Sequence, residues 1–253
     1  MNPKQKVLSK AARQLLAIEE LFDGLALPVG GPALPEFNQA RAVEGEIIPE
    51  LPAIEKTQAL ASMDADEIKP CTKCVLSRTR TNTVFGEGNT DADLVFVGEA
   101  PGHDEDMSGS PFVGRAGKLL TKMITAMGLS RDDIFICNVI KCRPPNNRTP
   151  AVEEVSACWG YLVRQLQIIR PRVIVTLGNP STKTLLNTTE GITRLRGTWQ
   201  EMPNTDPSLA GIAVMPTFHP SYVLRRYNAE TRGLVWSDLQ SVMKLLGLKM
   251  PKK

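Results

Sequence analysis

Four short apolar runs alternate with amphipathic segments along most of the chain, and this alternation restricts the fold more than any other feature. The runs, which we expect to be strands, cover residues 93–98, 134–140, 173–178 and 212–218. The segments with helical spacing cover residues 116–127, 152–169, 182–186 and 234–248. Continuous apolar strands that alternate with helices are typical of a parallel sheet buried on both faces. The sequence therefore predicts an α/β fold.

Polar and turn-forming residues follow three of these predicted strands. Glu99 begins a Glu-Ala-Pro-Gly turn, Asn138 lies near the end of the second strand, and His219 begins a His-Pro-Ser turn. In open parallel sheets, ligands bind beyond the carboxyl ends of the strands. We therefore expect Glu99, Asn138 and His219 to meet at one edge of the sheet.

The chain has five cysteines, and their spacing suggests a metal site. Cys71 and Cys74 form a Cys-x-x-Cys pair, and Cys142 and Cys158 follow with fifteen residues between them. Four cysteines suit Zn²⁺ or an iron–sulfur cluster, and the spacing alone does not choose between them. Cys137 lies within an apolar run, so we expect it to pack as a small core residue.

The charge is unevenly distributed along the chain. Residues 1–70 carry a net charge of −4, residues 71–253 carry +7, and the whole chain carries +3. A basic body favours a polyanionic partner such as DNA or RNA. A mildly basic solvated surface is the alternative on charge alone.

Residues 1–70 are predicted to form an extension that precedes a domain of residues 71–253. Residues 6–25 have helical spacing, whereas residues 27–70 contain six prolines, a Gly-Gly pair and scattered acidic residues, as flexible linkers do. The hypothesis for this extension is docking on a protein partner, and the alternative is a poorly ordered segment. The chain shows neither a signal peptide nor an 18-residue apolar window, so we expect a cytoplasmic protein without membrane contact.

Four motifs in order give the sequence its most specific signal. They are Gly-Glu-Ala-Pro-Gly at 98–102, Pro-Phe-Val-Gly-Arg-Ala-Gly at 111–117, Asn-Val-Ile-Lys-Cys-Arg-Pro-Pro at 138–145 and His-Pro-Ser-Tyr-Val-Leu-Arg at 219–225. Together with the four cysteines, they resemble the family 4, or iron–sulfur, uracil-DNA glycosylases over about residues 71–247. The resemblance implies a three-layer α/β/α sandwich with a mostly parallel four-stranded central sheet.

The resemblance also implies a cofactor and a reaction. A structural [4Fe–4S] cluster would be held by Cys71, Cys74, Cys142 and Cys158. The enzyme would flip uracil out of DNA and hydrolyse its N-glycosidic bond, which leaves an abasic site for base excision repair. We expect it to act as a monomer.

The catalytic residues implied by the resemblance are the three at the strand ends. His219 would donate a hydrogen bond to uracil O2, and Asn138 would bind O4 and N3–H. Glu99 would orient the attacking water or stabilise the sugar cation, although His103 departs from the pattern of this motif and leaves the water activator open.

Further residues would bind the base and the DNA backbone. Phe112 would stack on the flipped base. The residues expected to offer backbone groups and space are Gly98, Ala100, Pro101 and Gly102. The residues expected to contact phosphate are Arg115, Lys141, Arg143 and Ser221. Leu224 or Arg225 would fill the gap left by the flipped base. Residues 104–106 are expected to form only a polar turn.

Three alternatives stay open at this point. One is the branch of the same superfamily that traps DNA covalently through a histidine in an arginine-rich loop; the residues before His219 are Met-Pro-Thr-Phe, which contain no such loop. The second is a cluster-bearing protein that binds DNA without catalysis. The third is a zinc-stabilised module that binds nucleic acid.

Overall fold

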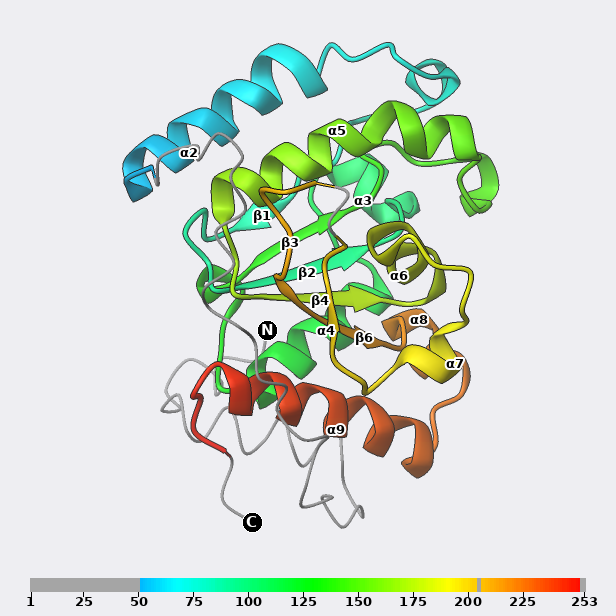
Figure 1. The fold of residues 1–253 in the computed structure, drawn as a ribbon. Helices are drawn as coiled ribbons and strands as arrows, with labels where there is room; N and C mark the ends of the chain where they lie inside the picture. The colour runs from blue at the N-terminus through cyan, green and yellow to red at the C-terminus, as the bar shows by residue number, and fades with distance from the viewer. Residues whose placement is uncertain (1–50, 204–205, 251–253) are drawn as a thin grey trace, which may run out of the picture.

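A computed structural model describes residues 51–203 and 206–250 (Figure 1). The helix predicted for residues 6–25 lies outside the described residues. Within them, no helix is long and apolar enough to cross a membrane.

The core of the structure is a six-stranded sheet with the strand order β1-β3-β2-β4-β6-β5. The four central strands are mutually parallel: β3 (Phe135–Asn138), β2 (Leu94–Gly98), β4 (Val173–Leu177) and β6 (Ala213–Thr217). These are the four predicted strands, and their parallel pairing confirms the α/β prediction. The two edge strands, β1 (Glu87–Gly88) and β5 (Gln200–Glu201), pair antiparallel and were not predicted, because two residues are too few to show a periodicity.

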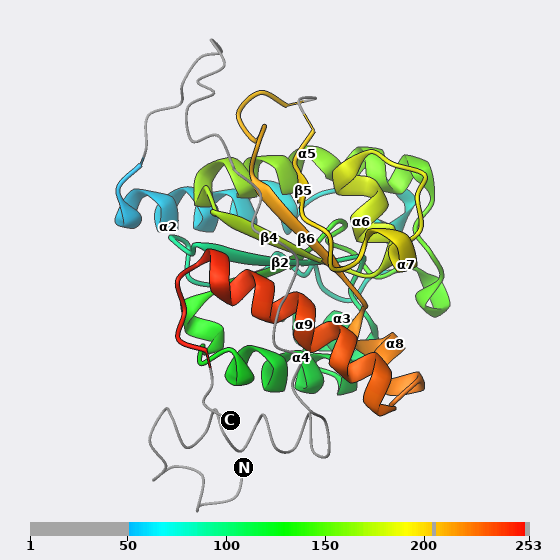
Figure 2. The same cartoon turned by 60° about the horizontal axis from the view of Figure 1, so that its bottom comes forward.

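Helices cover both faces of this sheet and complete the predicted three layers (Figures 1 and 2). On one face lie α4 (Arg115–Ala126) and α9 (Ala229–Leu245), which pack with Leu94 and Phe96 of β2. On the other face lies α5 (Val152–Ile169), which packs with Val95 and Val97. Successive residues of β2 thus enter opposite cores, which explains why the strand is apolar throughout.

Three shorter helices begin directly after the carboxyl ends of central strands. They are α3 (His103–Ser108) after β2, α6 (Asn179–Leu186) after β4 and α8 (Pro220–Arg225) after β6. A fourth short helix, α7 (Ile192–Leu195), precedes β5. The helix starts and the strand ends therefore share one edge of the sheet, where the loops can converge on a ligand.

The structure shows that the last part of the predicted flexible linker, residues 53–68, is helical. Helix α2 (Ala53–Ser62) continues into a π-helical turn (Met63–Ile68), and both lie along the outer side of α5 (Figure 1). Leu60, Met63 and Ile68 are buried, and Glu67 pairs with Arg164 of α5 through two hydrogen bonds. The few apolar residues among polar ones gave too weak a pattern to predict this helix, yet tertiary packing stabilises it.

Candidate active site

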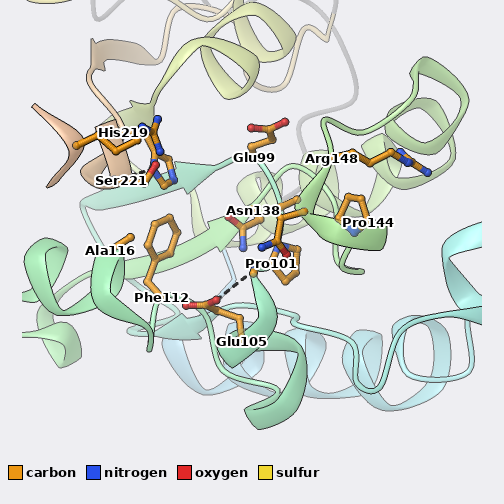
Figure 3. Close-up of a pocket in the computed structure, with 14 residues that line it drawn as sticks. Glu99, Pro101, Glu105, Phe112, Ala116, Asn138, Pro144, Arg148, His219 and Ser221 are labelled. Carbon is orange, nitrogen blue, oxygen red and sulfur yellow. Dashed lines mark hydrogen bonds between the residues drawn. The ribbon is translucent and has the colours of Figure 1, made fainter. Parts of the chain in front are cut away.

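A cavity of about 490 Å³ opens at the carboxyl ends of β2, β3 and β6 (Figure 3). Nine of the residues singled out in the sequence line it: Glu99, Ala100, Pro101, Gly102, Phe112, Asn138, His219, Ser221 and Arg225. Five further residues complete the lining: Glu105, Ala116, Pro144, Asn147 and Arg148. The three strand-end residues thus meet at one site, as the topology led us to expect.

Asn138 is the last residue of β3, and its side chain lies at the base of the cavity. Its Cα is paired with that of Gly98 on the neighbouring strand β2. A Cβ atom on Gly98 would lie only 2.3 Å from Oδ1 of Asn138, so glycine is required beside this amide. Asn138 is 1% exposed, and no donor among the described residues is within hydrogen-bond distance of Oδ1. A buried acceptor without a donor is costly, and a ligand N–H would satisfy it.

Phe112 presents its ring to the same cavity from a strained backbone position. Its φ is +52°, which is rare for an aromatic residue. Two features hold this conformation: Arg131 donates to the carbonyl oxygens of Pro111 at 2.7 Å and Phe112 at 3.2 Å, and Gly117 leaves space where a Cβ would lie 1.8 Å from the Phe112 oxygen. Backbone strain of this kind is often retained at binding sites, because it aims a side chain.

His219 lies opposite Phe112, with 5.7 Å between the ring centroids. The backbone N–H of Ser221 donates to Nδ1 of His219 at 3.1 Å, at the start of α8. Nδ1 is therefore the unprotonated nitrogen, and Nε2 carries the proton of the neutral ring. Burial, with a contribution from Arg225, lowers the pKa of His219 to about 4. The site therefore holds a neutral imidazole with an N–H donor at neutral pH.

Glu99 directly follows strand β2, and its carboxyl group lies in the wall of the cavity. Its side chain is partly buried, and it lines both the main cavity and a neighbouring cavity of about 530 Å³ beside α5 and α6. Burial raises the pKa of its carboxyl group above the usual value. A desolvated carboxylate is a stronger base than a solvated one, which suits a group that acts on water.

Glu105 has a positioning role that the sequence analysis missed. Its carboxylate accepts hydrogen bonds from the backbone N–H groups of Gly102 at 3.1 Å, Val113 at 2.9 Å and Gly114 at 3.0 Å. It therefore joins the turn after β2 to the loop that carries Phe112 (Figure 3). The prediction of a simple polar turn is wrong at this residue. The Glu at the third position of a helix after a glycine was a capping signal that could have indicated part of this role.

Comparison with known protein families identifies the superfamily to which the chain belongs. The family model of the uracil DNA glycosylase superfamily matches residues 85–240, which include all the cavity residues named above. The chain belongs to the uracil-DNA glycosylase superfamily.

The relatives place the chain in one branch of that superfamily. A type-4 uracil-DNA glycosylase from Thermotoga maritima is 47% identical over 184 residues, which are 72% of this chain and 93% of that protein. Proteins with the same name from Archaeoglobus fulgidus and Saccharolobus solfataricus are 48% and 46% identical; each alignment covers 73% of this chain, with 92% and 86% of those proteins. The resemblance stated from the motifs is thereby confirmed.

The four cysteines predicted to form a metal site surround another, smaller cavity. Cys71, Cys74, Cys142 and Cys158 all line it, together with Arg80 and Lys141. Arg80 donates from Nη1 to the Cys142 sulfur at 3.3 Å, and the backbone N–H of Lys141 donates to the Cys158 sulfur at 3.3 Å. The predicted ligands therefore line one cavity, whereas Cys137 is buried in the core and does not belong to the lining of that cavity.

The chemistry of this donor set fits a cluster with several iron atoms. Burial raises the pKa of the Cys142 thiol to about 11 and also raises that of Cys158, so the thiolate forms need positive charge nearby. In residues 51–203 and 206–250, no three metal-binding side chains converge closely enough to hold a single ion. Four thiols around one space, with N–H donors to two of the sulfurs, suit an iron–sulfur site.

The residues expected to contact DNA divide into two groups. Arg115, Leu224 and Arg225 are exposed near the cavity, and Arg143 is partly exposed and contacts His103 and Asn147. Lys141 is 1% exposed, and its ammonium is bound inside the protein. The prediction of a phosphate contact by Lys141 is therefore wrong, because its side chain cannot reach the surface.

Proposed function

We propose that this protein removes uracil from DNA by hydrolysing the bond between uracil N1 and deoxyribose C1′, which leaves an abasic site. The observation that carries the proposal is the unpartnered, buried Oδ1 of Asn138 in a cavity that also presents a neutral His219 and the Phe112 ring. Membership of the type-4 branch supports the same activity.

Asn138 recognises the base through its amide. Uracil presents a carbonyl O4 beside an N3–H, so a carboxamide can donate to the first and accept from the second. Cytosine presents the opposite pattern, with an amino group beside an acceptor nitrogen. A buried amide that is paired wrongly loses both hydrogen bonds, and a binding site whose buried polar groups are left unpaired rejects the wrong ligand strongly.

Phe112 binds the flipped base, and His219 stabilises the charge that develops on it. The Phe112 ring stacks on the flipped base, which contributes about 1–3 kcal/mol to binding. As the N1–C1′ bond breaks, negative charge develops on the base, and the Nε2–H of His219 donates to O2. A single donor of this kind typically accelerates a reaction by about 10²–10³-fold. A neutral hydrogen-bond donor keeps its proton throughout the reaction, so the imidazole does not have to be reprotonated before the next turnover.

Glu99 acts on the sugar side of the bond. Departure of the base leaves positive charge on the deoxyribose, which a carboxylate at the cavity wall stabilises. The same carboxylate accepts a hydrogen bond from the water that attacks C1′. Burial raises the pKa of Glu99 above its usual value, which makes the carboxylate a better hydrogen-bond acceptor for this water.

Cys71, Cys74, Cys142 and Cys158 are the residues that would hold a [4Fe–4S] cluster. Such a cluster would supply a covalent cross-link between the turn with Cys71 and Cys74, the segment after β3 and helix α5, and the proposed reaction transfers no electrons. This cross-link would fix the segment after β3, which carries Arg143 and ends beside the cavity at Pro144.

The proposal extends to the DNA contacts and to the organisation of the chain. The exposed Arg115 and Arg225 and the partly exposed Arg143 would contact phosphates beside Ser221. Leu224, which is 37% exposed, or Arg225 would enter the space left by the base. Residues 71–253 would form the glycosylase domain, acting as a monomer in the cytoplasm. Residues 1–70 would be an extension that docks on a partner protein through its N-terminal part, although α2 is packed on the body.

A base-release assay tests the proposed function. The full chain, purified with its iron content measured, is incubated with an end-labelled oligonucleotide that contains one uracil, and abasic sites are then cleaved with alkali. The expected result is cleavage at uracil, with free uracil identified by mass and strong loss in His219→Ala and Asn138→Ala. No cleavage by iron-loaded protein would overturn the proposal. A DNA adduct that survives denaturation would instead indicate the covalent-trapping branch.

A further inference from the structure

Lys141 lies between the uracil-recognition residue and the four cysteines, and neither function accounts for its side chain. It is among the largest fully buried side chains of the described residues, with 1% of it exposed. Its Nζ donates to the backbone oxygen of Asn138 at 2.8 Å and to Oε1 of Gln165 at 2.5 Å. Both acceptors are neutral oxygens, and no described carboxylate is within ion-pair distance of Nζ.

An ammonium in such a place needs an explanation. Burial of a charge is expensive unless it is paired or hydrogen-bonded, and an apolar side chain would fill the same space without that cost. The two oxygen atoms that the ammonium binds offset this cost, and one of them belongs to Asn138.

The hydrogen bonds around Asn138 show what the ammonium does. The peptide that follows Asn138 is held at both ends: its carbonyl oxygen accepts from Nζ of Lys141, and its N–H, on Val139, donates to the oxygen of Gly98 at 2.9 Å. The next N–H, on Ile140, donates to the oxygen of Glu99 at 3.2 Å. Since β3 ends at Asn138, no further strand pairing fixes the carbonyl of Asn138. The hydrogen bond from Nζ of Lys141 takes the place of that pairing.

Lys141 is itself held by two other parts of the chain, helix α5 and the segment that contains Val84 and Phe85. Its backbone N–H donates to the Cys158 sulfur on α5, and its oxygen accepts from the backbone N–H of Val84 at 2.8 Å. Gln165, also on α5, accepts from Nζ and donates from Nε2 to the oxygen of Phe85 at 2.9 Å. The lysine is thus part of the wall of the four-cysteine cavity and of the end of β3 at the same time.

We infer that Lys141 is a positioning residue for uracil recognition: its ammonium fixes the last carbonyl of β3 and so orients the amide of Asn138 toward the base. This inference rests on the proposed function, because it takes Asn138 to be the residue that binds uracil. It assigns to the buried lysine a role in selectivity instead of the phosphate contact expected from the sequence. It also provides a physical link from the cysteine site to the base pocket, through the Lys141 backbone.

A double-mutant cycle tests this inference. Single-turnover rates of uracil release are measured for the full-length wild type, Lys141→Met, Asn138→Ala and the double variant, with the exposed Lys118→Met as the matched control. Methionine keeps the length of the side chain and removes the donor. Visible absorbance and iron per protein are recorded for each variant.

We expect the single-turnover rate of uracil release to fall about tenfold in Lys141→Met, with the iron content unchanged. When Lys141→Met is added to Asn138→Ala, the rate should fall by less than about twofold. Equal losses in both backgrounds, no loss, or a loss that follows the iron content would overturn the inference. If Lys141→Met does not fold, Gln165→Met removes one of the two acceptors of Nζ and should show a smaller coupling of the same kind. Absence of uracil release by the wild type would contradict the proposed function instead.

Discussion

The backbone N–H of Ser221 donates to Nδ1 of His219 at 3.1 Å, and this contact determines which nitrogen of the ring can face the substrate. The hydroxyl group of Ser221 lies 2.8 Å from the same nitrogen. With Nδ1 occupied by donors, the neutral ring carries its proton on Nε2. The sequence His-Pro-Ser thus produces a preorganised N–H donor, because the residue two positions after the histidine lies in the first turn of helix α8 and presents its backbone N–H to Nδ1.

His219 should therefore stay neutral across the pH range in which the enzyme works. Its pKa is lowered from 6.5 to about 4, so the folded protein takes up this proton only below about pH 4, whereas the unfolded chain takes it up below about 6.5. Stability should accordingly decrease as the pH falls from 6.5 to 4. Nitrogen-15 NMR of the ring should show the Nε2–H tautomer at pH 7 and at pH 5. An imidazolium signal at pH 6 would contradict this account of the donor.

Glu99 should produce the acidic limb of the pH–rate profile. Burial raises its pKa above 4.5, and the ionised form is the active one, so the rate should fall as the pH decreases through that raised value. Glu99→Gln should be slower by about 10²-fold or more and should lose this limb. Single-turnover rates from pH 5 to 8 check both points. An unchanged limb in Glu99→Gln would show that another group titrates.

Gly98 should be essential for base recognition although it has no side chain. A Cβ at this position would lie 2.3 Å from Oδ1 of Asn138 and 2.6 Å from the Phe112 ring, so Gly98→Ala must displace both. We expect uracil release to fall by at least about 10²-fold. Gly160→Ala is the matched control, since nothing lies within 4 Å of its Cβ and alanine favours the helix by about 1 kcal/mol. Equal activity of both variants would argue against the observed arrangement of the amide and the ring.

Glu105 should affect activity more than its place on a short helix suggests. Glu105→Gln replaces one acceptor oxygen with an NH₂ group that opposes a backbone N–H, and this loosens the connection between the turn after β2 and the Phe112 loop. The loss of about one hydrogen bond corresponds to roughly a tenfold decrease in kcat/KM. The neighbouring exposed Asp104→Asn serves as the control. A loss of the same size in Asp104→Asn would assign the effect to surface charge.

Arg80 should stabilise the cluster that we propose for the four-cysteine cavity. Its guanidinium donates to the Cys142 sulfur and to the oxygen of Lys69 at 3.0 Å, so it offsets thiolate charge and fixes the entry to the cysteine cavity. Arg80→Met should lose its visible absorbance in a chelator about tenfold faster than the wild type. The exposed Arg78→Met, two residues earlier, should behave as the wild type. Identical rates in Arg80→Met and the wild type would exclude this role.

The fold was predictable because its central strands are buried on both faces. Residues such as Val95, Phe96 and Val175 have 0% exposure on either side of the sheet, and continuous apolar runs record this directly. The carboxyl-edge location of Glu99, Asn138 and His219 followed from the topology alone. The assignment of their roles depended on the resemblance, since turn residues of these types occur in many proteins.

What the sequence did not reveal are contacts made between distant segments. Lys141 lies beside Cys142 and Arg143, where a cation suggests a surface position; only the packing of Gln165 and the end of β3 around it makes it internal. Glu105 likewise contacts the backbone of Val113, eight residues later, and no local pattern specifies that contact. These residues act through tertiary hydrogen bonds, which leave no periodic signal.

The central claim is that the buried amide of Asn138 selects uracil in a cavity completed by Phe112 and His219. The most direct test is the single-turnover rate of base release from identical oligonucleotides that carry uracil or cytosine at one position. The account predicts rapid release of uracil, undetectable release of cytosine, and a loss of at least about 10²-fold for uracil in Asn138→Ala. Uracil release by Asn138→Ala at the wild-type rate would contradict it.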